Sequence, residues 1–450
     1  MRAAPLPRET TSVDADDANL AADATRQEPL NASADAHAEP TGEAATETSG
    51  HLDVERNAGA LPLPIILKTL QTRYGKSYQQ VFSEIVRLSF GPGKISMEEY
   101  LELGLFDDQA LADADKRAFV GYSVSQKLWE QANFRKDWHG FLDEKLAVTS
   151  LLGAYGYPVV PTLAIFTTNR SFPAFKTLRD HDELRIFLTD PAHYPLFGKP
   201  VDGAQSLGSI SFDNVDLEQG RLRTVQGERV AIDDIVAEIT EHYAEGYMFQ
   251  PRVVPHKRVR EICGNRLATV RVMTMLTPSG PQVLRAMWKL PVGDNAADNF
   301  WRPGNMVAQL DPVDGRIMRL QSGTGLEAQE HRVHPDTGMA LIDTRVPHWG
   351  AVIDTALEAA KVLKEAPLLG WDIAPTDEGA VIIEPNYTPD LHLAQIADRR
   401  GIMDETFTAF LASCAEMRDA RRARNRSERR AHTRANRERV LAGVRSGVRV

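Results

Sequence analysis

The sequence predicts an α+β protein in which a helical first part is followed by two segments rich in strands. Apolar residues recur at helical spacing before residue 143, short apolar runs alternate with helical patterns after it, and hairpin turns dominate the second half. We expect five regions: a disordered acidic tail over 1–56, a helical region over 57–143, one α+β segment over 144–255, a second over 256–416, and an Arg-rich tail over 417–450.

The composition narrows the class of protein. With 450 residues, of which 42% are apolar, the chain can bury a large core. No apolar run reaches the roughly 18–20 residues of a membrane-spanning helix, and the first ten residues lack the apolar stretch of a secretory signal. The two cysteines, Cys263 and Cys414, are too few for a disulfide scaffold or a four-cysteine zinc site. We therefore expect a cytoplasmic protein.

Charge is distributed unevenly along the chain. The net charge is −10, with −8 on residues 1–56, +9 on residues 418–450 and −11 on residues 57–417. The acidic body gives no reason to expect a general nucleic-acid-binding surface. The Arg-rich tail is either a solvated helix or partly disordered segment, or a contact for an anionic partner such as RNA, an anionic polymer or an acidic protein. The acidic N-terminal tail is an intramolecular candidate for that contact.

The elements follow from local patterns. Apolar residues from Tyr78 to Leu88 have helical spacing, and Ser96 with Glu99 forms a capping box at the start of another helix. A third helix ends near Gly153. Beyond it we expect strands over 159–166, 196–199 and 247–254, helices over 182–187, 231–243 and 349–364, and hairpins pairing 267–276 with 283–292, 306–310 with 317–320, and 368–375 with 380–385.

The last hairpin carries the most informative polar residues. With the turn centred near residue 378, Asp372 lies opposite Glu384, and Asn386 shares their face. Trp371, Ile373, Val381 and Ile383 then face the core. Two carboxylates roughly 5 Å apart repel unless a cation lies between them, and this set of oxygen atoms suits Mg²⁺. An exposed polar hairpin face is the alternative.

A second feature is a lysine at the end of a strand. Lys199 leads into a loop of small residues, Gly203, Ser206, Gly208 and Ser209, whose N–H groups can hold phosphate oxygens. A solvated lysine beside an ordinary loop is the alternative. The usual P-loop pattern is absent. Gly75-Lys76-Ser77 resembles the end of that motif, but Leu70 occupies the position of its first glycine.

A third feature is a pair of cations in apolar strands. Arg271 lies in a strand where alternation gives it the same face as Thr269 and Met273, and Lys289 lies on the partner strand. A cation there requires an anion. That anion is either a carboxylate in a structural salt bridge or a phosphoryl group in transfer.

In this order, the pieces resemble the ATP-grasp superfamily, and within it the sugar-transfer-associated group. The resemblance covers about residues 144–412, with Ala268 in place of a usual Asn and residues 302–305 in place of a usual glycine pair. The matching stretches are ATVRVMT (268–274), Asp298-Asn299, HPDTG (334–338), GWDIA (370–374), and Glu384-Pro385-Asn386 followed by Asp390 and Gln395.

The resemblance implies an ATP-grasp fold, in which two α+β subdomains grip ATP, and it assigns roles to residues. Lys199 and Lys145 match nucleotide-side lysines. Gln250, Arg252 and Val253 match the linker that contacts adenine, with Gln250 replacing a frequent glutamate. Asp372, Glu384 and Asn386 match the Mg²⁺ ligands. Arg271, with Lys289 as a weaker candidate, matches the catalytic cation near the γ-phosphate. His334 is either a substrate-side or a turn residue, and Asp298-Asn299 either faces the acceptor or has a loop role.

The resemblance also implies a reaction and its partners. We expect ATP and Mg²⁺ as cofactors, a carboxylate that is activated as an acyl phosphate, and an amine or other nucleophile that attacks it. A glycan or cell-envelope precursor as the carboxylate substrate rests on the resemblance alone. Two alternatives stay open: a phosphotransferase of the same fold, and a catalytically inactive ATP-binding protein whose Arg-rich tail binds a partner.

Overall fold

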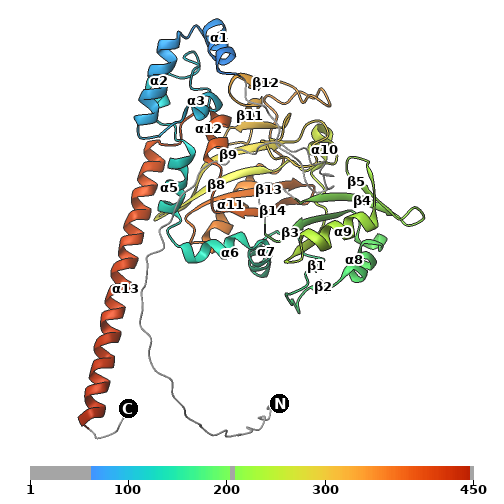
Figure 1. The fold of residues 1–450 in the computed structure, drawn as a ribbon, viewed down its shortest axis with the longest axis vertical. Coiled ribbons are helices and arrows are strands. Elements are labelled where there is room, and N and C mark those ends of the chain that lie inside the picture. The colour runs from blue at the N-terminus through green and yellow to red at the C-terminus, as the bar shows by residue number, and fades with distance from the viewer. Residues whose placement is uncertain (1–61, 203–207, 446–450) are drawn as a thin grey trace, which may run out of the picture. The chain divides into compact units, whose positions relative to one another are not determined.

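A computed structural model describes residues 62–202 and 208–445 (Figure 1). The predicted acidic tail over residues 1–56 lies outside the described residues. Within the described ranges, no helix is both long enough and apolar enough to cross a membrane.

The described chain begins with a group of short helices. Two of them start with capping boxes, in which a serine hydroxyl accepts from the third helical N–H while the side chain there bonds back: Ser77 with Gln80 and Ser96 with Glu99. The predicted Ser96 box is therefore confirmed. The helices are α1 (Leu63–Tyr74), α2 (Tyr78–Phe90), α3 (Met97–Glu102), α4 (Asp113–Lys116), α5 (Tyr122–Ala132) and α6 (His139–Asp143), with a 3-10 turn η1 (Lys136–Trp138).

The first sheet has seven strands in the order β2-β1-β7-β3-β4-β5-β6. Its central strands β7 and β3 run antiparallel, and helices α8 and α9 pack together beside it. The strands are β1 (Ala164–Phe166), β2 (Lys176–Leu178), β3 (Leu196–Pro200), β4 (Ile210–Asp216), β5 (Arg221–Thr224), β6 (Arg229–Ala231) and β7 (Tyr247–Pro251). The helices are α7 (Lys145–Ala154), α8 (His181–Leu188), η2 (Pro191–His193) and α9 (Ile232–His242).

The second sheet also has seven strands, in the order β12-β11-β10-β9-β8-β13-β14. Every pairing in it is antiparallel. The strands are β8 (Val270–Thr277), β9 (Gly280–Leu290), β10 (Met306–Leu310), β11 (Ile317–Ser322), β12 (Gln329–Glu330), β13 (Leu368–Thr376) and β14 (Gly379–Asn386). The helices are α10 (Lys257–Cys263), η3 (Gly325–Glu327), α11 (Trp349–Val362) and α12 (Leu391–Asp398).

The two faces of the second sheet are covered differently. On one face, α11 packs against Val270, Trp288 and Trp371 in one apolar core. On the other face, Met273 and Met287 join a core that includes the N-terminal helices, α12 and the start of α13. Because side chains alternate along a strand, Arg271 and Asp372 lie on this second face, beyond the end of its apolar part.

Helix α13 (Glu405–Arg445) ends the described chain. Phe407, Phe410 and Cys414 are buried at its start, whereas the side chains from 423 to 439 are exposed. Of the two structures expected for the Arg-rich segment, the helix is the one found, to Arg445. It has no Gly or Pro before Gly443 and is rich in Ala and Arg, which favour a helix even without tertiary packing.

Two predicted strands are shorter in the structure. Only Ala164–Phe166 of 159–166 is a strand, because Pro161 interrupts the run and Val159 makes only an isolated bridge to Ile382. The strand predicted to reach residue 254 ends at Pro251. The mixed α+β architecture is as predicted.

Candidate functional site

The β13–β14 hairpin has the predicted register at its polar end. Asp372 is the partner of Glu384, and Gly370 is the partner of Asn386. The turn itself is one residue tighter than expected, because Thr376 pairs with Gly379. A β-bulge beyond Asp372 restores the predicted pairing.

That bulge corrects one prediction. On the turn side of the bulge, Ile373 pairs with Ile382, so Ala380 and Ile382 are the β14 residues buried in the core. Val381 and Ile383 were expected there and are only half-buried. The extra residue reverses which side chains of β14 face the core between the turn and Glu384. Glu384 itself still lies on the same face of the sheet as Asp372.

Asp372 lies at the centre of a buried group of charges. Arg271 Nε donates to Asp372 Oδ1 at 2.5 Å and Nη2 to Oδ2 at 2.9 Å. Lys289 Nζ donates to Asp372 Oδ2 at 3.1 Å and lies 3.5 Å from Asp298 Oδ1. Asp298 in turn accepts from the backbone N–H and the hydroxyl of Thr269. The expected strand pairing of Arg271 and Lys289 is therefore found, with a protein carboxylate as their anion.

The pKa shifts follow from burial and from this pairing. Burial raises the pKa of Asp372, but Arg271 and Lys289 outweigh it and hold the pKa well below its usual range. Burial lowers the pKa of Arg271, but the attraction of Asp372 raises it by more, so the pKa lies above its usual value. Burial raises the pKa of Asp298 more than Lys289 lowers it. Asp372 is therefore a carboxylate held ionised by two cations.

Gly370 leaves room for this ion pair. A Cβ placed on Gly370 would lie 2.9 Å from Pro389 Cβ and 3.2 Å from Arg271 Cδ. The Arg271 side chain thus runs across the position that any larger residue would fill. The absence of a side chain at Gly370 therefore leaves space for both Pro389 and Arg271.

The residues proposed as Mg²⁺ ligands fit that ion in their donor chemistry. Carboxylate and amide oxygens are its preferred protein ligands. Glu384 makes no hydrogen bond or ion pair with any described residue, and the buried amide nitrogen of Asn386 has no partner there. Asp372 retains lone pairs beside those used by Arg271 and Lys289. Among the described residues, no three His, Cys, Asp or Glu side chains gather for a metal. The amide of Asn386 as a third ligand stays a prediction.

Lys199, on the first sheet, is under the electrostatic influence of this group. It lies on central strand β3 opposite Met248, and only 6% of it is exposed. Burial lowers the pKa of its ammonium, Glu384 and Asp372 raise it, and Lys145 lowers it. Lys199 is therefore influenced electrostatically by Lys145 and by two carboxylates of the second sheet. Lys145 begins α7, where its N–H lies 3.4 Å from the Val201 oxygen.

The loop after Lys199 is described only at its end. Gly203 and Ser206 lie outside the described residues. Gly208 has a φ of +70°, and a Cβ there would lie 2.5 Å from the Tyr243 hydroxyl oxygen. Its oxygen accepts from the Tyr247 hydroxyl at 2.8 Å. Gly208 therefore anchors the loop close to the sheet, with half-buried Ser209 after it.

The predicted nucleotide linker follows β7. The Gln250 side chain donates to the Val160 oxygen at 3.1 Å, which is a structural bond. Arg252 pairs with Asp213 at 2.5 Å, while its buried Nε has no partner among the described residues. Within the same part of the chain, the N–H groups of Val253 and Val254 donate to no protein oxygen. These N–H groups could donate to a ligand, and the adenine contact that the resemblance implies for Val253 stays a prediction.

Several motif residues prove to be structural. His334 is fully buried and donates to the Pro291 oxygen at 3.0 Å, which fits the turn alternative. Gln395 accepts from the Val120 N–H at 2.9 Å and donates to the Val120 oxygen at 3.0 Å, which ties α12 to the helical region. Trp371 is buried, as predicted.

One supporting residue carried no signal in the sequence. The Asn133 side chain donates to the oxygens of Leu368 at 2.8 Å and Tyr387 at 2.6 Å, and accepts from the Leu368 N–H at 3.0 Å. It thereby fixes the start of β13 and the residue after Asn386. A lone asparagine at a helix end is too common to be singled out from sequence.

Residues 123–409 match the family described as "Sugar-transfer associated ATP-grasp". The chain belongs to this family. ATP-grasp proteins are ATP-dependent ligases, and their fold typically uses ATP and Mg²⁺. The predicted family and fold are therefore confirmed. No curated protein sequence matches the chain.

Solved ATP-grasp ligases are similar in structure at low sequence identity. The ligase PsnB with a minimal precursor is 15% identical, with a TM-score of 0.33, and the match covers 62% of either chain. The D-alanine–D-alanine ligase from Coxiella burnetii is 13% identical, with a TM-score of 0.35, over 64% of this chain and 62% of that one. An L-amino acid ligase from Bacillus licheniformis is 12% identical, with a TM-score of 0.30, over 60% and 48%. The match spans less than two thirds of each of these proteins.

Proposed function

We propose that this ATP-grasp protein is an ATP-dependent carboxylate–amine ligase that works through an acyl phosphate. The observation that supports it best is that Glu384 and Asp372 on the second sheet raise the pKa of Lys199, which is buried on the first sheet. A buried ammonium within the electrostatic influence of two carboxylates is suited to a ligand that carries both phosphates and a divalent ion.

Each group then has a distinct task. Lys199, Gly208 and Ser209 would hold phosphate oxygens, and the backbone at Val253 would hold the base. Asp372, Glu384 and Asn386 would hold Mg²⁺, which would supply neutralisation of the phosphate charge. Arg271 is fixed by Asp372 next to this position, so its guanidinium is the best placed to stabilise negative charge on the transferred group.

The covalent steps need no protein nucleophile. The substrate carboxylate attacks the γ-phosphorus, the bond to the bridging oxygen breaks, and ADP leaves with that oxygen. An amine then attacks the acyl carbon, phosphate leaves, and the amine loses a proton. Lys289 and Asp298 keep Arg271 and Asp372 in register during both steps. The family description associates this chemistry with sugar transfer, so we propose a glycan-linked carboxylate as the substrate.

The test measures ADP release from the full chain with ATP and Mg²⁺ over amino acids and uronic acids, with hydroxylamine added to trap an acyl phosphate. A hydroxamate formed with one carboxylate, and an amide formed when an amine replaces hydroxylamine, would support the ligase. ADP formation with a phosphorylated product but no hydroxamate would favour the phosphotransferase. Tight ATP binding without turnover over the whole panel would favour the inactive binding protein.

A further inference from the structure

Helix α2 exposes a continuous stripe of large apolar side chains. Tyr78, Phe82, Val86 and Phe90 follow one another at intervals of four residues, so they lie on one side of the helix. Their exposed fractions are 52%, 71%, 39% and 81%. The opposite side, with Val81 and Leu88, is buried in the core. Helix α2 therefore packs on the core through its other side, and the stripe does not contribute to that packing.

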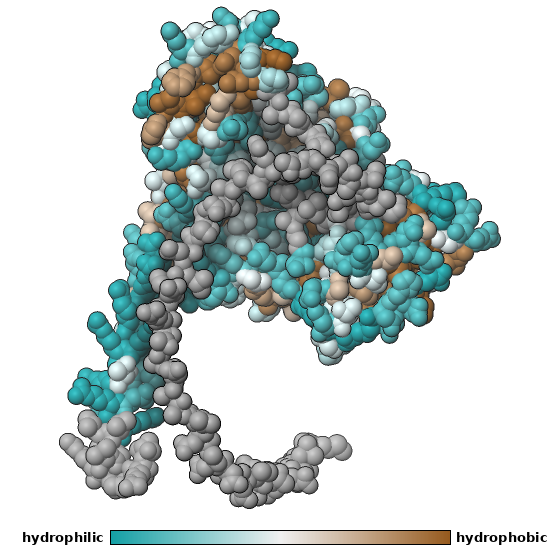
Figure 2. All heavy atoms as spheres, in the orientation of Figure 1, coloured by the Kyte–Doolittle hydropathy of each residue, from teal (hydrophilic) through white to brown (hydrophobic). Residues whose placement is uncertain are grey.

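The stripe extends onto the neighbouring helix. Leu63 and Ile65 at the start of α1 are 47% and 49% exposed. In Figure 2, brown side chains gather at the top of the view, where Figure 1 has α1 and α2. An exposed apolar patch built from several neighbouring side chains marks an interaction surface.

Basic residues outnumber acidic residues in the segment that forms α1 and α2. Between residues 62 and 95 the chain has five Lys or Arg and a single acid, Glu84, which is bound by Lys76 and the Tyr100 hydroxyl. Lys68, Arg73 and Lys94 are exposed and have no ion pair among the described residues. This basic surface lies on a chain whose net charge is −10.

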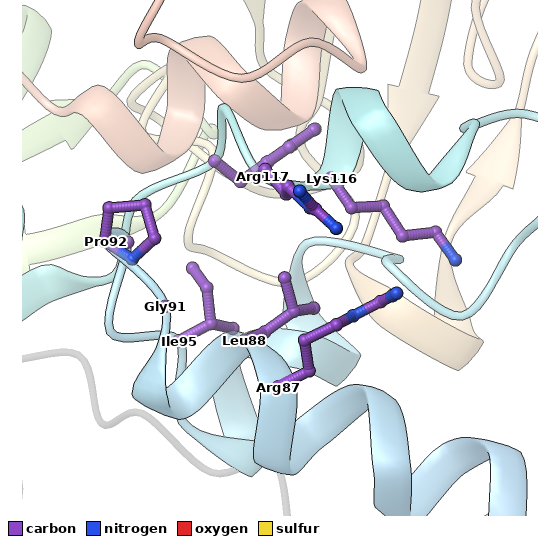
Figure 3. A pocket seen from close by; sticks show the side chains of 9 residues that line it. Arg87, Leu88, Gly91, Pro92, Ile95, Lys116 and Arg117 are labelled. Atoms are coloured by element: carbon purple, nitrogen blue, oxygen red, sulfur yellow. The ribbon is translucent and has the colours of Figure 1, made fainter.

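A pocket of about 190 Å³ opens beside the C-terminal end of α2 (Figure 3). Leu88, Ile95 and Phe119 supply apolar lining, and Arg87 and Arg117 also line it. Arg87 is paired with Asp113 at 2.6 Å, whereas Arg117 is exposed and forms no ion pair within the described residues. The pocket therefore repeats the combination of apolar side chains and cations found along the stripe.

We propose that the α1–α2 surface docks on an anionic phospholipid membrane. Aromatic and aliphatic side chains flanked by the unpaired cations Lys68, Arg73 and Lys94 are suited to an interface where acyl chains lie below negative headgroups. A symmetric pairing with a second copy would bring together two patches that share the same excess of Lys and Arg. The acidic residues 1–56 contain no aromatic residue to cover the stripe.

The test is sedimentation of the full chain with vesicles of phosphatidylcholine alone or mixed with phosphatidylglycerol. We expect binding to the mixed vesicles that weakens with salt, and partitioning about tenfold lower for Phe82→Gln/Phe90→Gln. Ile186→Gln/Val313→Gln is the matched control, because those side chains are 68% and 85% exposed elsewhere. It should bind like the wild type. Lys68→Glu/Arg73→Glu should lose the preference for phosphatidylglycerol.

Three outcomes would overturn the proposal. The wild type could fail to bind either kind of vesicle. The Phe82→Gln/Phe90→Gln variant could bind as well as the control, which would assign the contact to the arginines of α13. Light scattering could instead show a wild-type dimer that this variant dissociates. The proposal does not depend on the proposed function. ADP release with soluble substrates should be the same in the variant and the control.

Discussion

Arg271 and Asp372 form a two-pronged ion pair on adjacent strands, at 2.5 and 2.9 Å, and both side chains are nearly buried. This pair fixes the orientation of the guanidinium relative to the carboxylate, which single-point contacts do not. Each buried charge has also lost its hydration, and its attraction to the other partner offsets that loss.

Arg271→Ala should destabilise the chain and abolish ADP formation. Removing one partner leaves a buried carboxylate served only by Lys289, which typically costs about 3–5 kcal/mol in the free energy of unfolding. Urea unfolding gives that loss. Arg271→Lys should recover part of the stability and little of the activity, because an ammonium cannot make both bonds. A fully active Arg271→Lys variant would contradict the role of the fork.

Glu384→Gln should abolish ADP formation at almost unchanged stability. Glu384 has no hydrogen bond or ion pair among the described residues, so we expect the free energy of unfolding to change by less than about 1 kcal/mol. Thermal unfolding and Mg²⁺-dependent ADP release are the measurements. Glu378→Gln, in the turn of the same hairpin, is the control and should be fully active. Normal turnover by Glu384→Gln would reject the metal assignment.

Lys199→Met should weaken ATP binding and stabilise the free protein. A lost charge-assisted bond to phosphate costs about 1.5–3 kcal/mol, which is roughly 10- to 100-fold in affinity. Burial puts the folded-state pKa of Lys199 below its unfolded value, so between the two values the folded chain holds fewer protons and its stability rises with pH.

The stability gained by Lys199→Met should therefore be largest at neutral pH and should shrink as pH rises. Urea unfolding at several pH values, with calorimetric titration of ATP, measures both effects. Lys361→Met, on the surface of α11, is the control. Unchanged ATP affinity in Lys199→Met would contradict the phosphate role.

Gly370→Ala should reduce kcat for ADP release while the protein stays folded. The new Cβ would press on Pro389 and on the Arg271 side chain, and such overpacking costs about 1–3 kcal/mol. Steady-state ADP release should show a reduced kcat with a small change in the KM for ATP. Gly350→Ala is the control, since a Cβ there meets nothing within 4 Å in helix α11. Equal kcat values in the two variants would show that Gly370 does not position Arg271.

A chain ending at Met417 should keep its fold and its ADP release. The side chains that bury α13 are Phe407, Phe410, Leu411 and Cys414, all before the truncation. Thermal unfolding and ADP release are the readouts. Loss of turnover would instead favour a role of the arginine segment in the reaction.

The sequence predicted those parts of the fold and site that depend on local patterning. Alternation and turn residues were enough to place Asp372 opposite Glu384 and to put Arg271 on the strand face it occupies. The bulge beyond Asp372 was not predictable, because it adds a residue with no marker such as glycine. The predicted turn was one residue too long and the bulge was not predicted. These two errors cancel, so the predicted pairing of Asp372 with Glu384 is correct.

Long-range contacts were out of reach for a different reason. Whether Arg271 meets a carboxylate or a phosphate depends on which strand lies beside it, and Asp372 is about a hundred residues away. The loop residue Asp298 had two interpretations, since only the structure shows that it faces Lys289 and Thr269. The site roles of these residues remain predictions.

The amide of Asn133 has a consequence for how the chain is made. It bonds to Leu368 and Tyr387, 235 and 254 positions further along, so the helical region made early in translation has to wait for nearly the last strand before this contact closes. Such distant closure slows folding and leaves sheet edges open on the ribosome. We therefore expect neither half to be obtained as a soluble fragment when it is expressed alone. The two halves, encoded as separate chains, should complement each other only when they are synthesised in the same cell.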